Sequence, residues 1–345
     1  MKNIRFILLL LVAFCFTSCE VEFSPNAEWK DVPVVYCVLD QDDDTTWVRV
    51  ERCYLGEGNI YSYGAVRDSI TYPAGSLSVA ILAYQGGVLK DSIPFTETTI
   101  DREAGDFASV GMPIFYCKTQ NRLKQYYTYV LNIRKTDGSL LATTTPISLV
   151  KWTPTTNKPT PITQPSYTTS PSGAWVGGFK FNASSAMGSP MTSCLIEWDT
   201  LENARYYQPV VRFYYKVDGD TTYVDLKCPT KAGDNTSNKL NIYYSRDAFL
   251  DELKQQLKDD PRYKVNLNMV DVYLHCCTED LNAYLTSVLQ AGGINAEHSV
   301  YTNIKGGVGI FAARRTHIYK SMPFEQNNSD EGISTKITQL GINMH

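Results

Sequence analysis

Alternating apolar and polar residues dominate the chain between residues 33 and 145. An alternation of period two places successive side chains on opposite faces of a β-strand. Turn residues separate the runs, and no helical period lies between them. The pattern predicts an N-terminal β-sandwich domain over residues 33–145, which opens with a hairpin of residues 33–39 and 46–53. Further strands are expected over residues 76–84, 88–95, 113–117, 126–134 and 140–144, and a loop over residues 60–72.

A second β-rich domain is predicted over residues 173–345. Residues 146–172 precede it, and their six prolines among Thr and Ser favour an extended connector between the domains. In the second domain, Trp198 is followed by Ala204 and Tyr207, an order that resembles the early strands of a fibronectin type III domain. The predicted fold class is therefore mainly β, with two β-sandwich-like domains.

A helical period appears only in the last third of the chain. One helix is predicted over residues 246–258 with Ser245 as its cap, and a second begins after Thr278 and ends at Gly292. Their apolar stripes are Phe249, Leu250, Leu253 and Leu257 in the first helix, and Leu281, Leu285, Val288 and Leu289 in the second. Between the helices the alternation changes phase at Val270, which predicts one strand with a β-bulge.

The first 19 residues predict an exported, lipid-anchored protein. Two basic residues precede an apolar run at residues 7–16, which is too short to span a bilayer and has the length of a signal-peptide core. Small residues then stand directly before Cys19, an arrangement that resembles the lipobox of bacterial lipoproteins. We predict a signal peptide over residues 1–18, a lipid on Cys19 and a tether over residues 19–32. An ordinary secretory signal is the alternative.

Charge and composition narrow the classes of partner. The whole chain has a net charge of −4, which becomes −6 once Lys2 and Arg5 leave with the signal peptide. An acidic protein is a poor ligand for nucleic acid or an anionic lipid surface, so no nucleic-acid partner is expected. The 23 tyrosines favour strands and support the β assignment.

Seven cysteines remain in the predicted mature chain after Cys15 is removed and Cys19 is modified. Their number is odd and no spacing repeats, so they do not form a disulfide framework. Cys37 and Cys53 lie in the two runs that pair as the opening hairpin, where a bridge is one alternative. Buried free thiols are the expected state of the others: Cys117, Cys194, Cys228, Cys276 and Cys277.

Residues 301–312 read Tyr-Thr-Asn-Ile-Lys-Gly-Gly-Val-Gly-Ile-Phe-Ala, the most distinctive segment of the chain. Together with residues 33–39, the aspartate-rich turn 40–44 and residues 49–58, it resembles a family of Bacteroidota lipoproteins of unknown function, catalogued as DUF4249. The resemblance implies an outer-membrane lipoprotein of two β-rich domains, facing either the periplasm or the surface. It also implies association with TonB-dependent receptor systems, and it supplies no catalytic residues and no cofactor.

The glycines of this segment, Gly306, Gly307 and Gly309, have two interpretations. They can cradle an anion, but a phosphate loop needs Lys-Ser/Thr after its glycines and a Rossmann turn needs a helix there. A structural role, in which glycine allows a close backbone approach, is the preferred interpretation. We expect residues 306–311 to form a strand that closes the C-terminal domain against the helix after Thr278.

Two clusters contain metal-ligand residue types. Asp40, Asp42 and Asp44 have the spacing of a calcium loop, but an EF-hand needs Gly where Thr45 stands and helices at its flanks. In residues 275–277, His-Cys-Cys, neighbours in a strand point to opposite faces and do not converge on one ion. No metal site is therefore predicted.

Tyrosine pairs at 126–127, 206–207, 214–215 and 243–244 should place one ring on each face of a sheet. Core packing is the preferred explanation, and outward rings for stacking on sugars or anchoring a protein are the alternative. The sequence therefore predicts a non-enzymatic binding or assembly role, accessory to a TonB-dependent receptor or another envelope protein. A carbohydrate-binding component of a polysaccharide-uptake system is the alternative.

Overall fold

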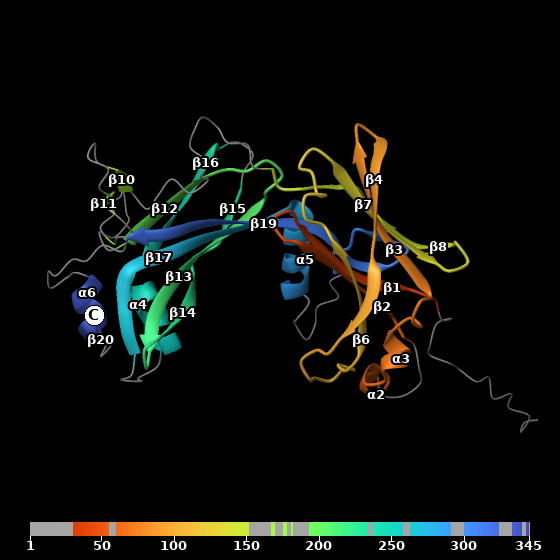
Figure 1. Cartoon of the computed structure of the whole chain (residues 1–345), viewed down its shortest axis with the longest axis horizontal. Helices are drawn as coiled ribbons and strands as arrows, with labels where there is room; N and C mark the ends of the chain where they lie inside the picture. Colours follow the sequence, from red (N-terminus) through yellow and green to blue (C-terminus); the bar gives the residue numbers. More distant parts are fainter. Residues whose placement is uncertain are drawn as a thin grey trace, which may run out of the picture.

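The computed structural model describes residues 30–54, 60–151, 167–169, 175–177, 181, 193–233, 237–257, 263–290, 300–323, 333–339 and 343–344. The predicted signal peptide, Cys19 and most of the connector lie outside these residues. The described part is mainly β, as the sequence predicts, and its strands gather into two halves (Figure 1). None of the helices in this part is long and apolar enough to cross a membrane.

Two sheets pack face to face in the N-terminal half. One consists, in spatial order, of the first half of β19 (Val308–Pro323), β1 (Pro33–Asp40), β2 (Thr45–Arg52), β6 (Met112–Lys118) and β5 (Thr96–Ile100). The other consists of β18 (Ile304–Lys305), β8 (Leu140–Thr144), β7 (Thr128–Lys135), β3 (Leu77–Gln85) and β4 (Val88–Pro94), with β9 (Ile147–Ser148) beside β7. Val35 and Phe115 of the first sheet share a buried core with Ile81 and Leu131 of the second. This is the sandwich that the alternating runs predict.

The C-terminal half has a second core on one face of the same long sheet. Its strands are β14 (Asp220–Lys227), β13 (Tyr206–Val217), β17 (Tyr263–Cys277) and the second half of β19. Over the inner face lie β12 (Ser193–Asp199), β16 (Lys239–Ser245), α4 (Arg246–Leu257) and α6 (Ile333–Gln339), which contribute to the core. Short strands are β10 (Tyr167–Thr169), β11 (Trp175–Gly177), β15 (Lys231–Ala232) and β20 (Asn343–Met344). Trp198 is fully buried 5.7 Å from the Tyr207 ring, while the fibronectin type III likeness stays a prediction.

Strand β19 joins the two halves into one sheet, ten-stranded within the described residues. From Val308 to Arg314 it runs parallel to β1, and from Arg314 to Pro323 it pairs antiparallel with β17. Figure 1 shows it in blue, crossing from one half to the other. The prediction that residues 306–311 close the C-terminal domain is therefore wrong, since Val308–Phe311 pair with β1 and complete the N-terminal sandwich. The other part of that prediction is confirmed, because the helix after Thr278 packs on β19. Order along the chain does not predict the partner of this strand, because strands that are far apart in the sequence can pair when packing favours it.

The helices differ from the prediction in two places. Helix α4 and α5 (Glu279–Gln290) form where the periodicity predicts them, but α2 (Ile60–Gly64) and α3 (Arg67–Ile70) occupy the expected loop. The expected stripe of α5 stays largely in solvent, with Leu289 83% exposed. Helix α5 packs on β19, and beside that stripe its Tyr284 ring meets the Tyr36 ring of β1 edge-on at 6.1 Å. The bulge in β17 is confirmed, because the register shifts on both sides of Val270: between Val265 and Val270 against β13, and between Val270 and Val272 against β19.

Candidate functional site

The glycine-rich segment crosses from one sheet of the N-terminal sandwich to the other. Ile304 in β18 pairs with β8, and four residues later the chain enters β19 beside β1. The Asn303 side chain holds this arch together: its amide nitrogen donates to the Phe311 carbonyl at 2.7 Å. Its amide oxygen accepts from the Phe311 backbone N–H at 2.9 Å. Phe311 is fully buried in the N-terminal core, so the arch brings a core residue into place.

The three candidate glycines lie where neighbouring backbone leaves no room for a side chain. A Cβ on Gly306 would lie 2.8 Å from the Leu141 carbonyl oxygen, and one on Gly307 would lie 2.5 Å from that of Pro33. At Gly309, φ is +113° and a Cβ would overlap the Val35 carbonyl oxygen. Close approach of this kind is a packing reason for glycine. The anion-cradle alternative has no comparable observation in its favour.

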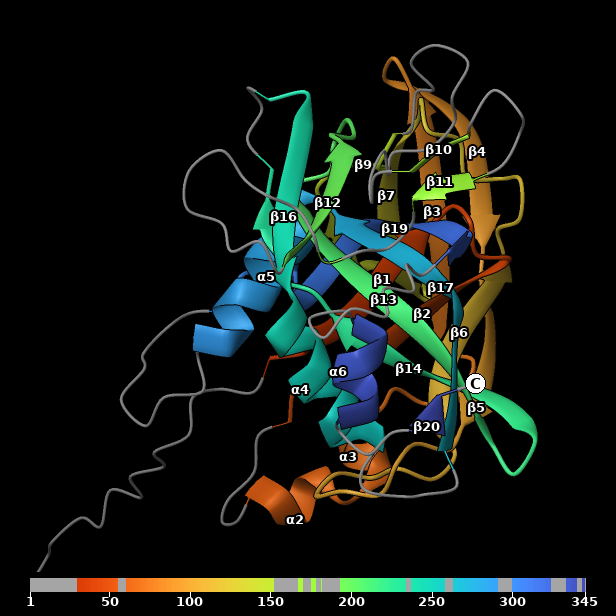
Figure 2. The same cartoon turned by 90° about the vertical axis from the view of Figure 1, so that its left-hand side faces the viewer.

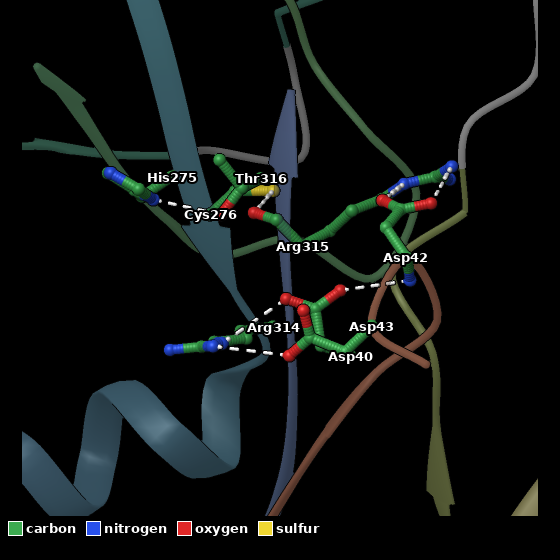
Figure 3. A network of polar contacts seen from close by, with 8 residues as sticks. All are labelled: Asp40, Asp42, Asp43, His275, Cys276, Arg314, Arg315 and Thr316. Carbon is green, nitrogen blue, oxygen red and sulfur yellow. Dashed lines mark hydrogen bonds and ion pairs between the residues drawn. The ribbon is translucent and has the colours of Figure 1, made fainter. Parts of the chain in front are cut away.

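The aspartate-rich turn after β1 clamps β19 where the two halves meet (Figure 3). Arg314 Nε donates to an Asp40 carboxylate oxygen at 3.2 Å, and the Arg314 Nη2 lies 3.5 Å from Asp43. Arg315 leaves the strand on the opposite side and donates to both oxygens of Asp42 at 2.9 and 3.2 Å. The turn therefore contacts Arg314 and Arg315 on opposite sides of β19, at the point where the pairing partner of that strand changes from β1 to β17.

The ion pairs with Arg314 and Arg315 account for the clustering of aspartates in this turn without a metal ion. Burial raises the pKa of Asp40, while the Asp42 backbone N–H and the Arg314 guanidinium oppose the rise. Asp44 contributes its backbone carbonyl, which accepts from Thr119 at 3.0 Å. Within the described residues, no group of three His, Cys, Asp or Glu side chains is placed to hold a metal ion.

The His275 and Cys276 side chains lie on opposite faces of β17, as alternation predicts. His275 Nδ1 is 2.9 Å from the Thr316 hydroxyl on the outer face, and the buried Cys276 thiol donates to the Arg315 carbonyl. A Cys37–Cys53 bridge is ruled out, because Cys37 pairs with Val48 and Cys53 lies at the other end of the hairpin. The seven described cysteines are free thiols, and all except Cys53 are buried.

Lowering the pH from about 7 to about 5 is expected to destabilise the protein through His317. Burial lowers the pKa of His317 below the usual 6.5, and Arg315 lowers it further while Asp42 opposes the shift. Folding therefore disfavours the protonated ring, so the contribution of His317 is full above pH 6.5 and is lost as the pH falls toward the folded pKa. Urea unfolding at the two pH values measures this loss. His317→Gln carries no proton to gain, so it should lose less stability than wild type; an equal loss would assign the effect elsewhere.

An ordered group of charged and aromatic side chains covers the outer face of the C-terminal sheet. We call it the Arg212 face; its residues are Arg212 and Tyr214 of β13, Tyr223 and Asp225 of β14, and Asp271, Tyr273 and His275 of β17. Strand register puts Arg212 opposite Asp225 on one side and opposite Asp271 on the other. The inward residues of the same strands, such as Val211 and Val272, are buried in the core.

Arg212 is the centre of this face. Its Nε and Nη2 donate to the two oxygens of Asp225 at 2.7 and 2.8 Å, and its Nη1 donates to the Tyr273 hydroxyl at 3.0 Å. The guanidinium carbon lies 3.8 Å from the ring centroid of Tyr223 and 4.5 Å from that of Tyr273. A bidentate ion pair between two aromatic rings orients these four side chains: Arg212, Asp225, Tyr223 and Tyr273.

The tyrosine pairs behave as the alternation predicts in β13 and β16. Tyr207 and Tyr244 are buried, whereas Tyr243 is 40% exposed. Tyr214 points outward and donates to Asp271 at 2.7 Å, while Tyr215 packs against the core. The pairs therefore supply both buried core rings and outward rings, and the role of the outward rings stays a prediction.

An open pocket of about 550 Å³ lies between the turn before β13 and the start of α5. An Arg205–Glu279 ion pair of 2.9 Å forms part of its wall. The remaining lining is mostly polar: Thr200, Leu201, Glu202, Asn203, Ala204, Gly233, Ser237 and Asn238. A third charged residue of the lining, Glu202, pairs with Lys151 at 2.6 Å. Among the residues that the structure describes, no aromatic ring lines this pocket, whereas the Arg212 face combines an ion pair with three tyrosine rings.

Sequence reasoning missed Arg212, Arg314 and Arg315. The available signal is the polar, outward phase of the strands, in which Arg212, Tyr214 and Asp225 alternate with core residues. That phase reveals an outward face but not which strands lie side by side.

Comparisons with known proteins add little. No family model matches the chain, and no curated protein matches it. Among solved structures, a chain titled "Cytokine receptor complex - Crystal form 2" is similar over 70% of this chain and 89% of that one. The identity is 10% and the TM-score 0.19, too slight a likeness to bear on fold or function.

Proposed function

We propose that this protein is a lipid-anchored protein of the bacterial outer membrane, in the DUF4249 family, that works by binding or assembly. The lipid on Cys19 anchors the protein to the membrane. Its protein partner is a TonB-dependent receptor or another envelope protein. The support for export and anchoring is the pattern of residues 1–19. The observation that carries a binding role is the Arg212 face.

Binding fits this face better than catalysis because the two central groups, Arg212 and Tyr214, hold fixed protonation states near neutral pH. Burial and the hydrogen bond to Asp271 raise the pKa of Tyr214 to about 12. The hydrogen bonds that Arg212 donates to Asp225 raise the pKa of Arg212 further above its usual high value. A general acid or base works best with a pKa near the operating pH. Arg212 and Tyr214 are held far from that range, which favours a recognition role for them.

A carbohydrate-binding component of a polysaccharide-uptake system is the alternative function. The observation in its favour is that three tyrosine rings, at 214, 223 and 273, share the Arg212 face. Aromatic rings offer an apolar body and a polar hydroxyl to a ligand.

Cys19→Ala is expected to abolish the anchor. The variant should accumulate as an unprocessed precursor, and it should not label with radioactive palmitate, whereas wild type should label and partition with outer membranes. Cys53→Ala is the matched control, since Cys53 is an exposed cysteine in the mature chain, and it should label like wild type. Normal processing and labelling of Cys19→Ala would refute the lipoprotein proposal.

The partner is tested by cross-linking wild type in intact outer membranes and identifying the linked proteins by mass spectrometry. A TonB-dependent receptor that is linked to wild type but not to Cys19→Ala supports the accessory role. Linkage to no envelope protein would refute it.

A further inference from the structure

We propose that the Arg212 face binds a neutral oligosaccharide, with the Tyr223 ring as the stacking platform. The inference rests on the proposed function, because it names the ligand of a protein that acts by binding. It is carried by the geometry of four side chains, Arg212, Tyr223, Asp225 and Tyr273, on three adjacent strands.

The side chains of the face are ordered by contacts with one another, without a ligand. Three of the five N–H groups of Arg212 are used among the described residues, two by Asp225 and one by Tyr273. These bonds fix the guanidinium between two rings. Tyr223 meets Tyr214 edge-on, with centroids 6.2 Å apart. A surface whose side chains are already ordered loses little conformational entropy on binding.

The Tyr223 ring remains available despite these contacts. Its side chain is 48% exposed, while the guanidinium lies over the ring at 3.8 Å. The edge contact with Tyr214 and the cation contact with Arg212 leave ring surface in solvent. An exposed, immobilised aromatic ring is suited to the C–H face of a pyranose, which is apolar and flat.

The charges of the face favour a neutral ligand. The Arg212 charge is balanced by Asp225 in a bidentate pair, and Asp271 accepts from the Tyr214 hydroxyl. An anionic ligand would have to compete with Asp225 for the guanidinium. Sugar hydroxyls both donate and accept, so they can bond to the outer N–H groups and to the carboxylate oxygens without breaking the pair. One balanced ion pair, a hydrogen-bonded carboxylate and aromatic rings together match a neutral carbohydrate.

The face is long enough for more than one sugar residue. It continues from Tyr273 to His275, whose rings are stacked at 6.1 Å, and then to Thr316 and the 38% exposed Ile318 on β19. From β14 to β19 there are three strand spacings, roughly 14 Å in total. We therefore expect an oligosaccharide to bind better than its monosaccharide.

The experiment uses the full mature lipoprotein in detergent and isothermal titration with maltoheptaose, xylohexaose and mannohexaose. At least one probe should bind, and Tyr223→Ala should weaken that binding about tenfold or more, as expected for the loss of an anchoring ring. Tyr223→Phe keeps the ring and should bind within about twofold of wild type. Tyr243→Ala is the matched control, because Tyr243 is similarly exposed on a strand outside the face.

Two results would overturn the proposal: no binding of any of the three probes, or binding that Tyr223→Ala leaves unchanged. Polygalacturonate is the anionic comparison, and preference for it over every neutral probe would also overturn the assignment.

Membrane cross-linking of Tyr223→Ala separates this proposal from the proposed function. Retained linkage to a TonB-dependent receptor without sugar binding would leave the accessory role standing and remove the glycan site. Lost linkage without sugar binding would identify the face as a protein interface.

Discussion

Gly309→Ala is expected to lower the free energy of unfolding by about 2–5 kcal/mol. Two penalties combine at this position. An L-residue held at φ +113° is strained by about 1–3 kcal/mol, and forcing a methyl group into a packed site costs a similar amount. The new Cβ would meet the Val35 carbonyl oxygen, which belongs to the neighbouring strand and cannot rotate away. Since Val35 pairs with Gly309 in the β1–β19 ladder, relief requires the strands to separate.

Urea unfolding monitored by circular dichroism measures this loss. Gly219→Ala is the matched control, because Gly219 has φ +99° but nothing within 4 Å of its would-be Cβ. The control should show the conformational penalty alone, about 1–2 kcal/mol. If the two variants lose the same stability, close approach to Val35 is not what requires glycine at position 309.

The period of the apolar pattern predicts the local elements well. The opening hairpin, most strands of the N-terminal half and helices α4 and α5 all form within one or two residues of their expected ends. These elements follow from local chemistry: alternation for strands, a 3.6-residue period for helices, and Gly or Pro where they stop. Helices α2 and α3 escape this reasoning because four or five residues are too few to show a period.

The pattern does not predict which elements pair. Strand β19 was expected to offer one face to a core, yet both of its faces are buried near position 311. Phe311 faces the sandwich core, while Ile310 and Ala312 are buried on the face where α5 packs. A strand covered on both faces loses the alternation that would reveal its orientation.

The same limit applies to the candidate site. Arg212, Asp225 and Tyr273 come from three strands, and only the registers between those strands bring them together. The sequence shows that each is outward-facing in its own strand. It does not show that a guanidinium will lie between two particular rings, because that depends on a pairing between residues 61 positions apart.

Asn303→Leu is expected to destabilise the protein by about 2–5 kcal/mol, although leucine has a similar volume. The Asn303 side chain satisfies both the N–H and the carbonyl of Phe311, and all the atoms involved are buried. Leucine removes both hydrogen bonds and leaves two buried backbone groups without partners, each of which costs roughly 1–3 kcal/mol. Asn241→Leu on the exposed side of β16 is the control and should change stability by less than about 0.5 kcal/mol.

Asn303→Asp tests the same contact more finely. Its carboxylate can still accept from the Phe311 N–H but cannot donate to the Phe311 carbonyl. It would also stand against Asp280, whose carboxylate now accepts from the Asn303 amide at 3.3 Å. Hydrogen exchange at the Phe311 amide separates the effects: leucine should expose this amide to exchange, whereas aspartate should keep it partly protected. Wild-type protection in the leucine variant would contradict the role of Asn303, since the amide would then have to be protected by some contact other than that side chain. The arch between β18 and β19 is therefore expected to depend on an asparagine amide that imitates a missing strand partner.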